Sequence, residues 1–327
     1  MSPDRDVRVG VVGVGALGQH HARVYAGLPG ARLAGVYDVS ASQASEVATR
    51  HGVRAFAHLR DLLSEVDAVS VAVPTVDHLR VSRAALEAGK DVLVEKPIAV
   101  TLEEADELIG LASARKAVLQ VGHIERFNPV AELLSATVTG PRFIEVHRLG
   151  SFSARSLDID VVLDLMIHDL DIVLSLDGSA VVQVDAVGVP VLTPKVDIAN
   201  ARLRFASGLI ANLTASRVSA EKIRKFRVFA PHTYISVDFA ARDAQVYRLG
   251  KPGPEGLPEI SVERTETPDT PEAEPLRRQL AAFLEAARNR SRPVITGEDG
   301  RRALQLAQRI LERIGAPAGG PGEPSGS

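Results

Sequence analysis

Cysteine is absent from this chain. The protein therefore has no disulfide, no thiolate nucleophile and no metal site built on sulfur ligands. Long apolar runs are missing too, because no stretch reaches the 18 residues expected of a membrane-spanning segment. The first residues, MSPDRD, are polar and acidic, unlike the apolar core of a signal peptide. From these absences we expect a cytoplasmic protein that is not held in a membrane.

A strong charge of either sign is also missing. The chain has 38 lysines and arginines against 41 aspartates and glutamates, which gives a net charge of −3 at pH 7. Nucleic-acid-binding proteins and membrane-surface proteins usually carry a basic surface. We therefore expect neither nucleic acid nor a membrane as a partner. With 327 residues, the chain is long enough for about two domains with separate cores.

The clearest pattern that is present lies near the start. Val7–Val12 is short, rich in β-branched residues and apolar, as in a parallel strand buried on both faces. It leads into the GxGxxG of Gly13–Gly18, an amphipathic run over Ala16–Leu28 and a second apolar strand over Arg32–Tyr37. A glycine turn alone often only connects a strand to a helix. Strand, turn, helix and strand in this order indicate dinucleotide binding.

Each glycine of the turn has a separate task. Gly13 permits the tight turn, Gly15 lets the backbone approach a pyrophosphate, and Gly18 lets the helix pack closely on the strand. The helix start at Ala16 and Leu17 directs backbone N–H groups and the positive end of the helix dipole toward the phosphates. These five residues form the predicted phosphate-binding part of a cofactor site.

Asp38 follows the second strand and is the predicted ribose-binding residue. It lies 20 residues after Gly18, where a carboxylate can accept hydrogen bonds from ribose hydroxyl groups. The same carboxylate would repel the 2′-phosphate of NADP, and the next residues, Val39–Ser42, offer no arginine to neutralise one. The sequence therefore predicts NAD as the cofactor.

Strand-like and helix-like segments alternate as far as Val121, which predicts an α/β fold with a doubly wound parallel sheet of six strands. After about Asn128, alternating strands such as NARLRFASG predict an α+β domain with a large, mainly antiparallel open sheet. We expect a long loop over Lys251–Pro275 and closing helices over Leu276–Ala287 and Gly300–Ile314. The expected division is an NAD-binding domain (1–125), a substrate-binding and oligomerisation domain (126–271), closing helices that pack back on the first domain (272–315) and a disordered tail (316–327).

Glu95-Lys96-Pro97 is the first group of residues that points to chemistry. It follows the predicted buried strand Asp91–Val94. Open α/β sheets bind their ligands beyond the carboxyl ends of the strands, so Lys96 can reach into the crevice beside a nicotinamide. The alternative is a surface lysine before a proline that starts a loop, and position alone does not decide between the two.

Asp164, His168 and Asp171 form the second group. They are spaced i, i+4 and i+7 in the predicted helix Val161–Leu176 and would share one face of an otherwise apolar helix. Histidine accepts a proton near neutral pH, and a carboxylate can orient it or the substrate. A solvated acidic face and a His/Asp metal site are the alternatives. Because no convincing third and fourth ligand is present, we expect no metal.

The third group lies in Gly122–Pro129, GHIERFNP, where the first predicted domain leads into the second. His123, Arg126 and Asn128 in this segment could line a substrate cleft between the domains. Hydrogen bonding at an interdomain hinge is the alternative, and the residues alone favour it slightly.

Together these motifs resemble the Gfo/Idh/MocA oxidoreductases, the family of glucose–fructose oxidoreductase and inositol dehydrogenase. The similarity runs from Val7 to about Ile314, and the EKP and DxxxHxxD motifs in this order are much more specific than GxGxxG. The matching pieces are Gly13–Gly18, Pro74-Thr75 with His78, Glu95-Lys96-Pro97, Gly122-His123, and Asp164 with His168 and Asp171.

The resemblance implies roles for these residues. A sugar-like alcohol would lie between Lys96, Asp164, His168 and the nicotinamide, with Lys96 and His168 as the proton-handling pair. The Lys96–Pro97 peptide would be cis, and the open face of the second sheet would join chains into a homodimer or homotetramer. Beyond the glycine turn and Asp38, the residues expected at the cofactor are Val73, Pro74, Thr75, His78, Glu95 and Lys96.

Within the family, Gly122–Pro129 and Ser153–Leu176 look most like enzymes that oxidise the 3-hydroxyl of UDP-N-acetylglucosamine. That oxidation precedes transamination in making a diaminosugar for lipid A. The expected partner is therefore a nucleotide-sugar substrate, with Arg126 and Arg155 as the cations at its diphosphate. A dehydrogenase of another sugar or of inositol, and a non-catalytic NAD-binding sensor, are the alternatives. The residues expected to bind the substrate are His123, Arg126, Asn128, Arg155, Asp164 and His168.

Overall fold

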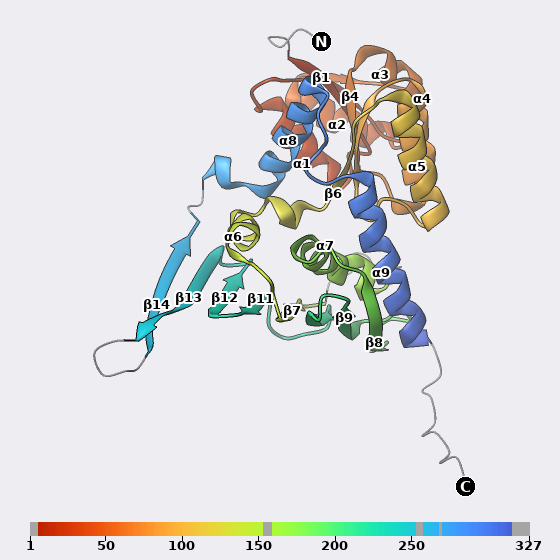
Figure 1. The fold of residues 1–327 in the computed structure, drawn as a ribbon. Coiled ribbons are helices and arrows are strands. Elements are labelled where there is room, and N and C mark those ends of the chain that lie inside the picture. Colours follow the sequence, from red (N-terminus) through yellow and green to blue (C-terminus); the bar gives the residue numbers. More distant parts are fainter. Residues whose placement is uncertain (1–5, 153–158, 253–257, 268–269, 316–327) are drawn as a thin grey trace.

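The computed structural model describes residues 6–152, 159–252, 258–267 and 270–315, and it arranges them around two sheets (Figure 1). The predicted disordered tail and Arg155 lie outside the described residues. Within the described ranges, no helix is both long enough and apolar enough to cross a membrane.

The first sheet is parallel throughout, with the strand order β3-β2-β1-β4-β5-β6. Every residue of β4, β5 and β6 is buried, because helices cover both faces of the sheet. The expected doubly wound sheet is confirmed, although β3 lies where no strand was predicted. Its strands are β1 (Val7–Val12), β2 (Ala31–Tyr37), β3 (Arg54–Ala55), β4 (Ala68–Val71), β5 (Asp91–Glu95) and β6 (Leu119–Gly122). The accompanying helices are α1 (Gly18–Ala26), α2 (Ala41–His51), α3 (Leu59–Glu65), α4 (His78–Glu87) and α5 (Leu102–Arg115), with short 3-10 turns η1 (Thr75–Asp77) and η2 (Ile124–Phe127).

The second sheet has the order β14-β13-β12-β11-β7-β10-β9-β8. Only the β7–β10 pair is parallel among its described strands, so the expected mainly antiparallel sheet is confirmed. Buried and exposed residues alternate along β9, as expected when one face is covered. Its strands are β7 (Phe143–Leu149), β8 (Val181–Val189), β9 (Ile198–Phe205), β10 (Ile210–Ser216), β11 (Ile223–Ala230), β12 (Thr233–Asp238), β13 (Asp243–Pro252) and β14 (Pro258–Glu266). The remaining helical segments are α6 (Pro129–Thr137), η3 (Val162–Met166), α7 (Ile167–Leu176), η4 (Pro271–Ala273), α8 (Pro275–Asn289) and α9 (Gly297–Gly315).

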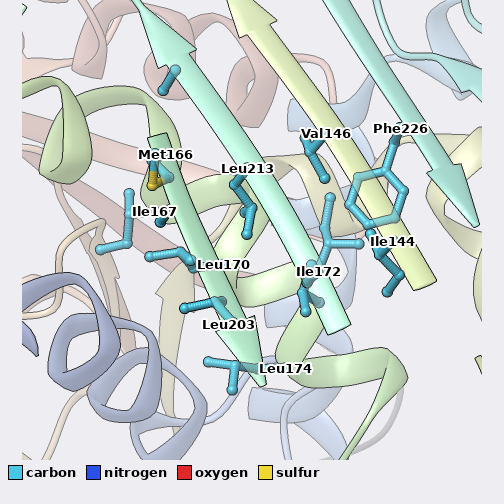
Figure 2. Close-up of a cluster of buried hydrophobic side chains, with 14 of the residues drawn as sticks. Ile144, Val146, Met166, Ile167, Leu170, Ile172, Leu174, Leu203, Leu213 and Phe226 are labelled. Carbon is cyan, nitrogen blue, oxygen red and sulfur yellow. The ribbon is translucent and has the colours of Figure 1, made fainter. Parts of the chain in front are cut away.

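The covered face of the second sheet packs against η3 and α7 (Figure 2). Leu203, Leu213 and Phe226 from three strands belong to one buried cluster with Met166 and Leu170 from these helical segments. Each such side chain contributes about 1.5–3 kcal/mol when it is fully buried. The helical segment that carries the predicted catalytic residues is therefore held firmly on the sheet.

The loop predicted over Lys251–Pro275 is wrong, because β14 occupies part of it. β14 pairs only with β13, at the edge of the second sheet. Even its apolar residues Ile260 and Val262 are 66% and 54% exposed, so the strand has no buried face to produce an apolar alternation. Its pairing comes from the neighbouring strand, and its charged residues are typical of an edge strand.

The closing helices contact different parts of the molecule. α8 contacts α1 and η2 beside the first sheet. α9 contacts α5 and β6 of the first half, and also α7 and β8 of the second, and in Figure 1 it extends along one side of the molecule from the first half to the second. The division of the chain into residue ranges by domain stays a prediction.

Candidate active site

The glycine turn has the geometry that its sequence predicts. Gly13 has a φ of +81°, and a Cβ there would lie 2.8 Å from the Ala72 carbonyl oxygen. A Cβ at Gly18 would lie 1.8 Å from the Gly13 carbonyl oxygen, so only glycine fits. A Cβ at Gly15 would meet no atom within 4 Å, which leaves the outer side of the turn open to a ligand. The turn is therefore closed by two glycines and accessible at the third.

The surroundings of the turn fit a dinucleotide. α1 begins after Leu17 without a side-chain cap and without an acidic residue in its first turn, so an anion would meet its N–H groups without competition from a carboxylate. Asp38 Oδ2 accepts a 2.7 Å hydrogen bond from the Val14 N–H, and its Oδ1 accepts a 2.8 Å bond from the Ser40 N–H. These bonds place Asp38 directly beside the turn, at the end of β2.

His78 lies under the loops that follow β4 and β5. Its Nδ1 is 2.8 Å from the Pro97 carbonyl oxygen and its Nε2 is 3.0 Å from the Val73 carbonyl oxygen. The ring is buried, and burial lowers the pKa of His78 although both carbonyl groups favour its protonated form. His78 therefore joins the loop that carries Val73, Pro74 and Thr75 to the loop after Lys96, and its predicted cofactor contact stays a prediction.

Glu95 and Lys96 are directed to different places, and the predicted cis peptide between Lys96 and Pro97 is confirmed. The Glu95 carboxylate is buried, 3.2 Å from His21 Nε2 and 3.3 Å from Gln279 Nε2. Burial would raise the pKa of Glu95, but His21, Gln279 and Lys96 outweigh it and hold the pKa below its usual value. The buried contacts of Glu95 thus hold the carboxyl end of β5 in place.

Lys96 reaches across to the second half of the chain. Its Nζ donates a 2.5 Å hydrogen bond to the Asp164 carbonyl oxygen and lies 3.5 Å from Asp164 Oδ1. Burial lowers the pKa of Lys96, against the attraction of the Asp164 and Glu95 carboxylates. The structure therefore brings together two of the three predicted catalytic residues, which are 68 positions apart in the sequence.

Asp164 lies in η3, a π-helical turn that precedes α7. Such turns are rare in proteins, but those that occur are often found at functional sites. A π-helical turn has more than 3.6 residues per turn, so the α-helical spacing assumed for Asp164, His168 and Asp171 does not hold through η3. Asp164 contacts Lys96, whereas Asp171 Oδ1 lies 3.8 Å from Arg126 Nη1. The two carboxylates therefore have different cationic partners, and their shared face stays a prediction.

His168 lies in the first turn of α7, beside His123, the residue that follows β6. The two rings are perpendicular, with centroids 6.4 Å apart. Among the described residues, neither ring nitrogen of His123 nor His168 Nδ1 has a hydrogen-bond partner. Burial and the charges of Lys96 and Arg148 hold the pKa of His168 well below its usual value, and burial lowers that of His123 to about 3. Both imidazoles are therefore neutral near pH 7.

A buried ionic network that the sequence analysis missed lies next to His168. Arg148 on β7 donates hydrogen bonds of 2.7 and 2.8 Å to the two carboxylate oxygens of Asp169, and one of 2.8 Å to Glu125 Oε1. Arg224 Nη1 lies 3.5 Å from the same Glu125 oxygen. The available signal was Arg148 itself, because it falls on the face of β7 that is otherwise apolar. The network ties η2, β7 and α7 together.

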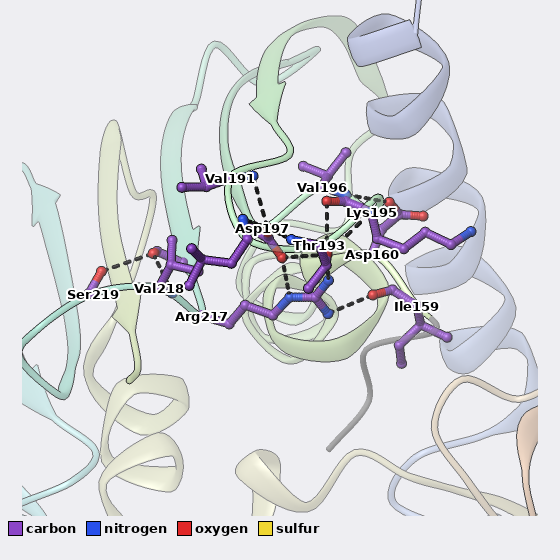
Figure 3. Close-up of polar contacts among 12 residues, drawn as sticks. Ile159, Asp160, Val191, Thr193, Lys195, Val196, Asp197, Arg217, Val218 and Ser219 are labelled. Atoms are coloured by element: carbon purple, nitrogen blue, oxygen red, sulfur yellow. Dashed lines mark hydrogen bonds and ion pairs between the residues drawn. The ribbon is translucent and has the colours of Figure 1, made fainter. Parts of the chain in front are cut away.

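A second missed cluster fixes the chain just before η3 (Figure 3). Asp197 Oδ2 accepts hydrogen bonds of 2.7–2.8 Å from the N–H groups of residues 191–193, and its Oδ1 accepts one of 2.7 Å from Arg217 Nε. Arg217 Nη1 also donates a 2.7 Å bond to the Ile159 carbonyl oxygen. Asp160 Oδ1 accepts a 2.9 Å bond from the Val196 N–H. The entry into the turn that carries Asp164 is thus held by Arg217, the residue after β10, and by the bond between Asp160 and the Val196 backbone.

The other predicted substrate residues have mainly structural partners. Asn128 Oδ1 accepts a hydrogen bond from the Val130 N–H and caps α6, whose first residue is Pro129. The Asn-Pro pair is itself a helix-start signal that sequence reasoning could have used. Arg126 Nη2 donates to the Val294 carbonyl oxygen, besides its contact with Asp171. The described residues include no cluster of three or more His, Asp or Glu side chains suited to a metal ion.

Known proteins share this arrangement. The family described as an oxidoreductase family with an NAD-binding Rossmann fold matches residues 7–123, and its GFO/IDH/MocA C-terminal domain matches residues 133–235. UDP-N-acetylglucosamine 3-dehydrogenase from Acidithiobacillus ferrooxidans is 43% identical over 311 residues, which are 95% of this chain and 98% of that protein. Inositol 2-dehydrogenase from Acidothermus cellulolyticus is 33% identical over 57% of this chain and 58% of that protein.

Solved structures agree with the sequence matches. A structure of the Acidithiobacillus ferrooxidans UDP-N-acetylglucosamine 3-dehydrogenase has a TM-score of 0.88 at 42% identity, over 94% of this chain and 97% of that one. A levoglucosan dehydrogenase shares the fold, with a TM-score of 0.83 at 19% identity over 95% of this chain and 96% of that one. The parallel sheet with its glycine turn, the open second sheet and the full-length identity lead to one conclusion: the chain belongs to the GFO/IDH/MocA family of NAD-binding oxidoreductases, as its motifs predicted.

Proposed function

We propose that this chain is an NAD-dependent dehydrogenase that oxidises the 3-hydroxyl of UDP-N-acetylglucosamine to a ketone. The observation that carries the choice of substrate is the 43% identity, along 95% of the chain, to a UDP-N-acetylglucosamine 3-dehydrogenase. The contact between Lys96 and Asp164, with His168 beside it, supports catalysis rather than ligand sensing, because a sensor does not require proton-handling groups at the cofactor.

The proposed chemistry assigns a task to each of these residues. NAD⁺, when bound along the glycine turn, supplies the acceptor for the hydride of the alcohol carbon. His168 accepts the hydroxyl proton, since its imidazole is neutral near pH 7. Lys96 donates a hydrogen bond to the same oxygen as negative charge develops, an effect of a few kcal/mol when the donor is preorganised. Asp164 holds the Lys96 ammonium in place through its carbonyl and carboxylate oxygens.

NAD rather than NADP is the proposed cofactor. Asp38 would face a 2′-phosphate with a negative charge, and the adjacent Val39 is 87% exposed and carries no charge. Converting Asp38→Ser together with Val39→Arg should move the preference toward NADP. The variant Val39→Arg alone is the control, because it keeps the bond between Asp38 and Val14. A wild-type protein that already prefers NADP would refute the argument from Asp38.

A homodimer or homotetramer through the open face of the second sheet is also proposed. Four aromatic residues on four neighbouring strands form a row across this face, with ring centroids 4.8–5.7 Å apart. They are Phe143, Phe229, Tyr234 and Tyr247. Rows of apolar side chains on a sheet face are suited to a self-complementary interface. Light scattering should give a mass above 34.8 kDa, and Phe229→Arg should lower it.

The decisive experiment measures NADH formation from NAD⁺ and UDP-N-acetylglucosamine. Because alcohol oxidation by NAD⁺ is usually uphill, the assay includes an aminotransferase and glutamate that remove the ketone. We expect NADH with the nucleotide sugar and little with free glucose or inositol. Turnover of inositol or glucose, with none on UDP-sugars in the coupled assay, would instead favour the inositol-type relatives.

A further inference from the structure

A basic pocket of about 260 Å³ lies at the start of β11. Its walls come from η2, the beginning of β11, the β12–β13 turn and the first residue of α8. Three lining side chains are cationic, namely Lys222, Arg224 and Arg242, and one is acidic, Glu125. The lining therefore carries a positive charge although the chain as a whole is slightly acidic.

The carboxylate of Glu125 in this pocket already has cationic partners. Glu125 Oε1 accepts a 2.8 Å hydrogen bond from Arg148 and lies 3.5 Å from Arg224. Asp169 takes the other side of Arg148, so two acids and two arginines balance each other. Lys222 forms no ion pair with another described residue. Arg242 adds a further cation to the lining. An anion in the pocket would thus meet positive charge rather than the Glu125 carboxylate.

The Arg148 network links the pocket to the catalytic cluster, because Arg148 binds Glu125 in the pocket lining and Asp169 beside His168. Glu125 follows His123 by two residues, and Asp169 is the residue after His168. The charge of Arg224 is among those that act on His168.

We propose that this pocket is the diphosphate subsite of the nucleotide-sugar substrate, with Lys222 and Arg242 as its phosphate-binding cations and Arg224 offsetting the charge of Glu125. The inference rests on the proposed function and replaces the earlier expectation of Arg126. Arg126 is held by Asp171 and the Val294 carbonyl group, so its guanidinium is engaged at another surface. A nucleotide sugar carries two phosphate charges, which match the cationic lining, and a free sugar carries none.

The test compares Lys222→Gln and Arg242→Gln with a matched control, Lys225→Gln. Lys225 lies on the same strand as Arg224 but is exposed and points to the opposite face of the sheet. The measurements are the KM for UDP-N-acetylglucosamine in the coupled assay, and the Kd of UDP, uridine and inorganic pyrophosphate by calorimetry. Each pocket variant should raise the KM and the UDP Kd about 10-fold, the scale of one charge-assisted contact. The values of kcat and the NAD Kd should stay within about twofold.

The comparison of UDP, uridine and pyrophosphate identifies which part of the ligand the pocket binds. Uridine should bind equally to all variants, whereas UDP and pyrophosphate should both be weakened by the pocket variants. Unchanged UDP affinity and KM in both variants, with a wild-type enzyme that oxidises UDP-N-acetylglucosamine, would overturn the subsite and leave the proposed function standing. A wild-type protein that neither oxidises the nucleotide sugar nor binds UDP would overturn both.

Discussion

The glycine turn and the catalytic cluster are two parts of one candidate active site, and they are built in different ways. The turn uses consecutive residues, and its shape follows from backbone sterics at Gly13 and Gly18. The cluster takes Lys96, His123, Asp164 and His168 from separate elements and depends on packing between them. A local motif can therefore be recognised from its own residues, whereas an assembled cluster needs charges and helices elsewhere to hold it.

The largest expected effect separates chemistry from cofactor binding. Lys96→Met keeps most of the side-chain bulk but removes the charge, and His168→Ala removes the imidazole. If the two residues share proton transfer and oxyanion stabilisation, each change should lower kcat by roughly 10²–10⁴. The NAD Kd and melting temperature should barely change, because neither residue belongs to the glycine turn. Single-turnover NADH formation measures the loss in the chemical step, and an NAD titration measures the NAD Kd.

The double variant tests whether Lys96 and His168 act as a unit. Its loss should be smaller than the product of the two single losses, since groups that act together are not additive. Lys225→Met, at an exposed lysine, is the control and should have wild-type turnover. Near wild-type turnover in either single variant would remove that residue from the mechanism.

The next effect concerns the network that holds the assembled cluster. Arg148→Met would leave the Glu125 and Asp169 carboxylates buried without their cation, at a cost of about 3–5 kcal/mol in the free energy of unfolding. Arg50→Met is the matched control, because Arg50 also forms a 2.7 Å ion pair, with Glu46, but both partners are exposed on α2. It should cost about 1 kcal/mol or less. Urea unfolding of both variants measures the two losses in the free energy of unfolding. Equal losses would contradict the prediction that the buried ion pairs contribute more than the exposed pair.

The glycine turn should respond in a position-dependent way. Gly18→Ala places a methyl group against the Gly13 carbonyl oxygen and should lower the free energy of unfolding by about 1–3 kcal/mol, with loss of NAD binding. Gly15→Ala meets no atom of the protein and should leave stability unchanged. Its methyl group occupies the space expected for the pyrophosphate, so the NAD Kd should rise about tenfold or more. Thermal melting and NAD titration of both variants test the prediction, and unaltered NAD affinity in Gly15→Ala would contradict the placement of the cofactor.

The smallest effect is a pH dependence at Asp171. Burial raises the pKa of Asp171 to about 7, although Arg126 opposes the shift. The folded state therefore binds a proton that the unfolded state has lost, and this contribution to stability fades as pH rises from about 4 to 7. Asp171→Asn should raise the melting temperature at pH 8, with little change at pH 4, and should leave kcat nearly unchanged. The exposed Asp185→Asn is the control, and a large loss of kcat in Asp171→Asn would return Asp171 to the catalytic group.

Sequence reasoning was most accurate where neighbouring residues act on each other. Apart from β3, the strands of the first sheet, the glycine turn and the antiparallel second sheet were predictable, because burial on two faces or one produces a distinct apolar pattern. β14 was missed because an edge strand has no buried face. The face shared by Asp164, His168 and Asp171 stays a prediction, because it assumed α-helical spacing through what is a π-helical turn.

The sequence by itself determined the doubly wound sheet, the position of the dinucleotide turn and the two motifs that carry Lys96 and His168. Local sterics and apolar periodicity suffice for these features, since they act over a few residues. Only the tertiary structure decided that Lys96 contacts Asp164, that Arg148 joins Glu125 to Asp169, and that Asp171 faces Arg126. These pairs form because the packing of α7 on the second sheet buries charged groups next to each other. The residues that are brought together in this way are far apart in the chain, so local sequence patterns do not reveal them.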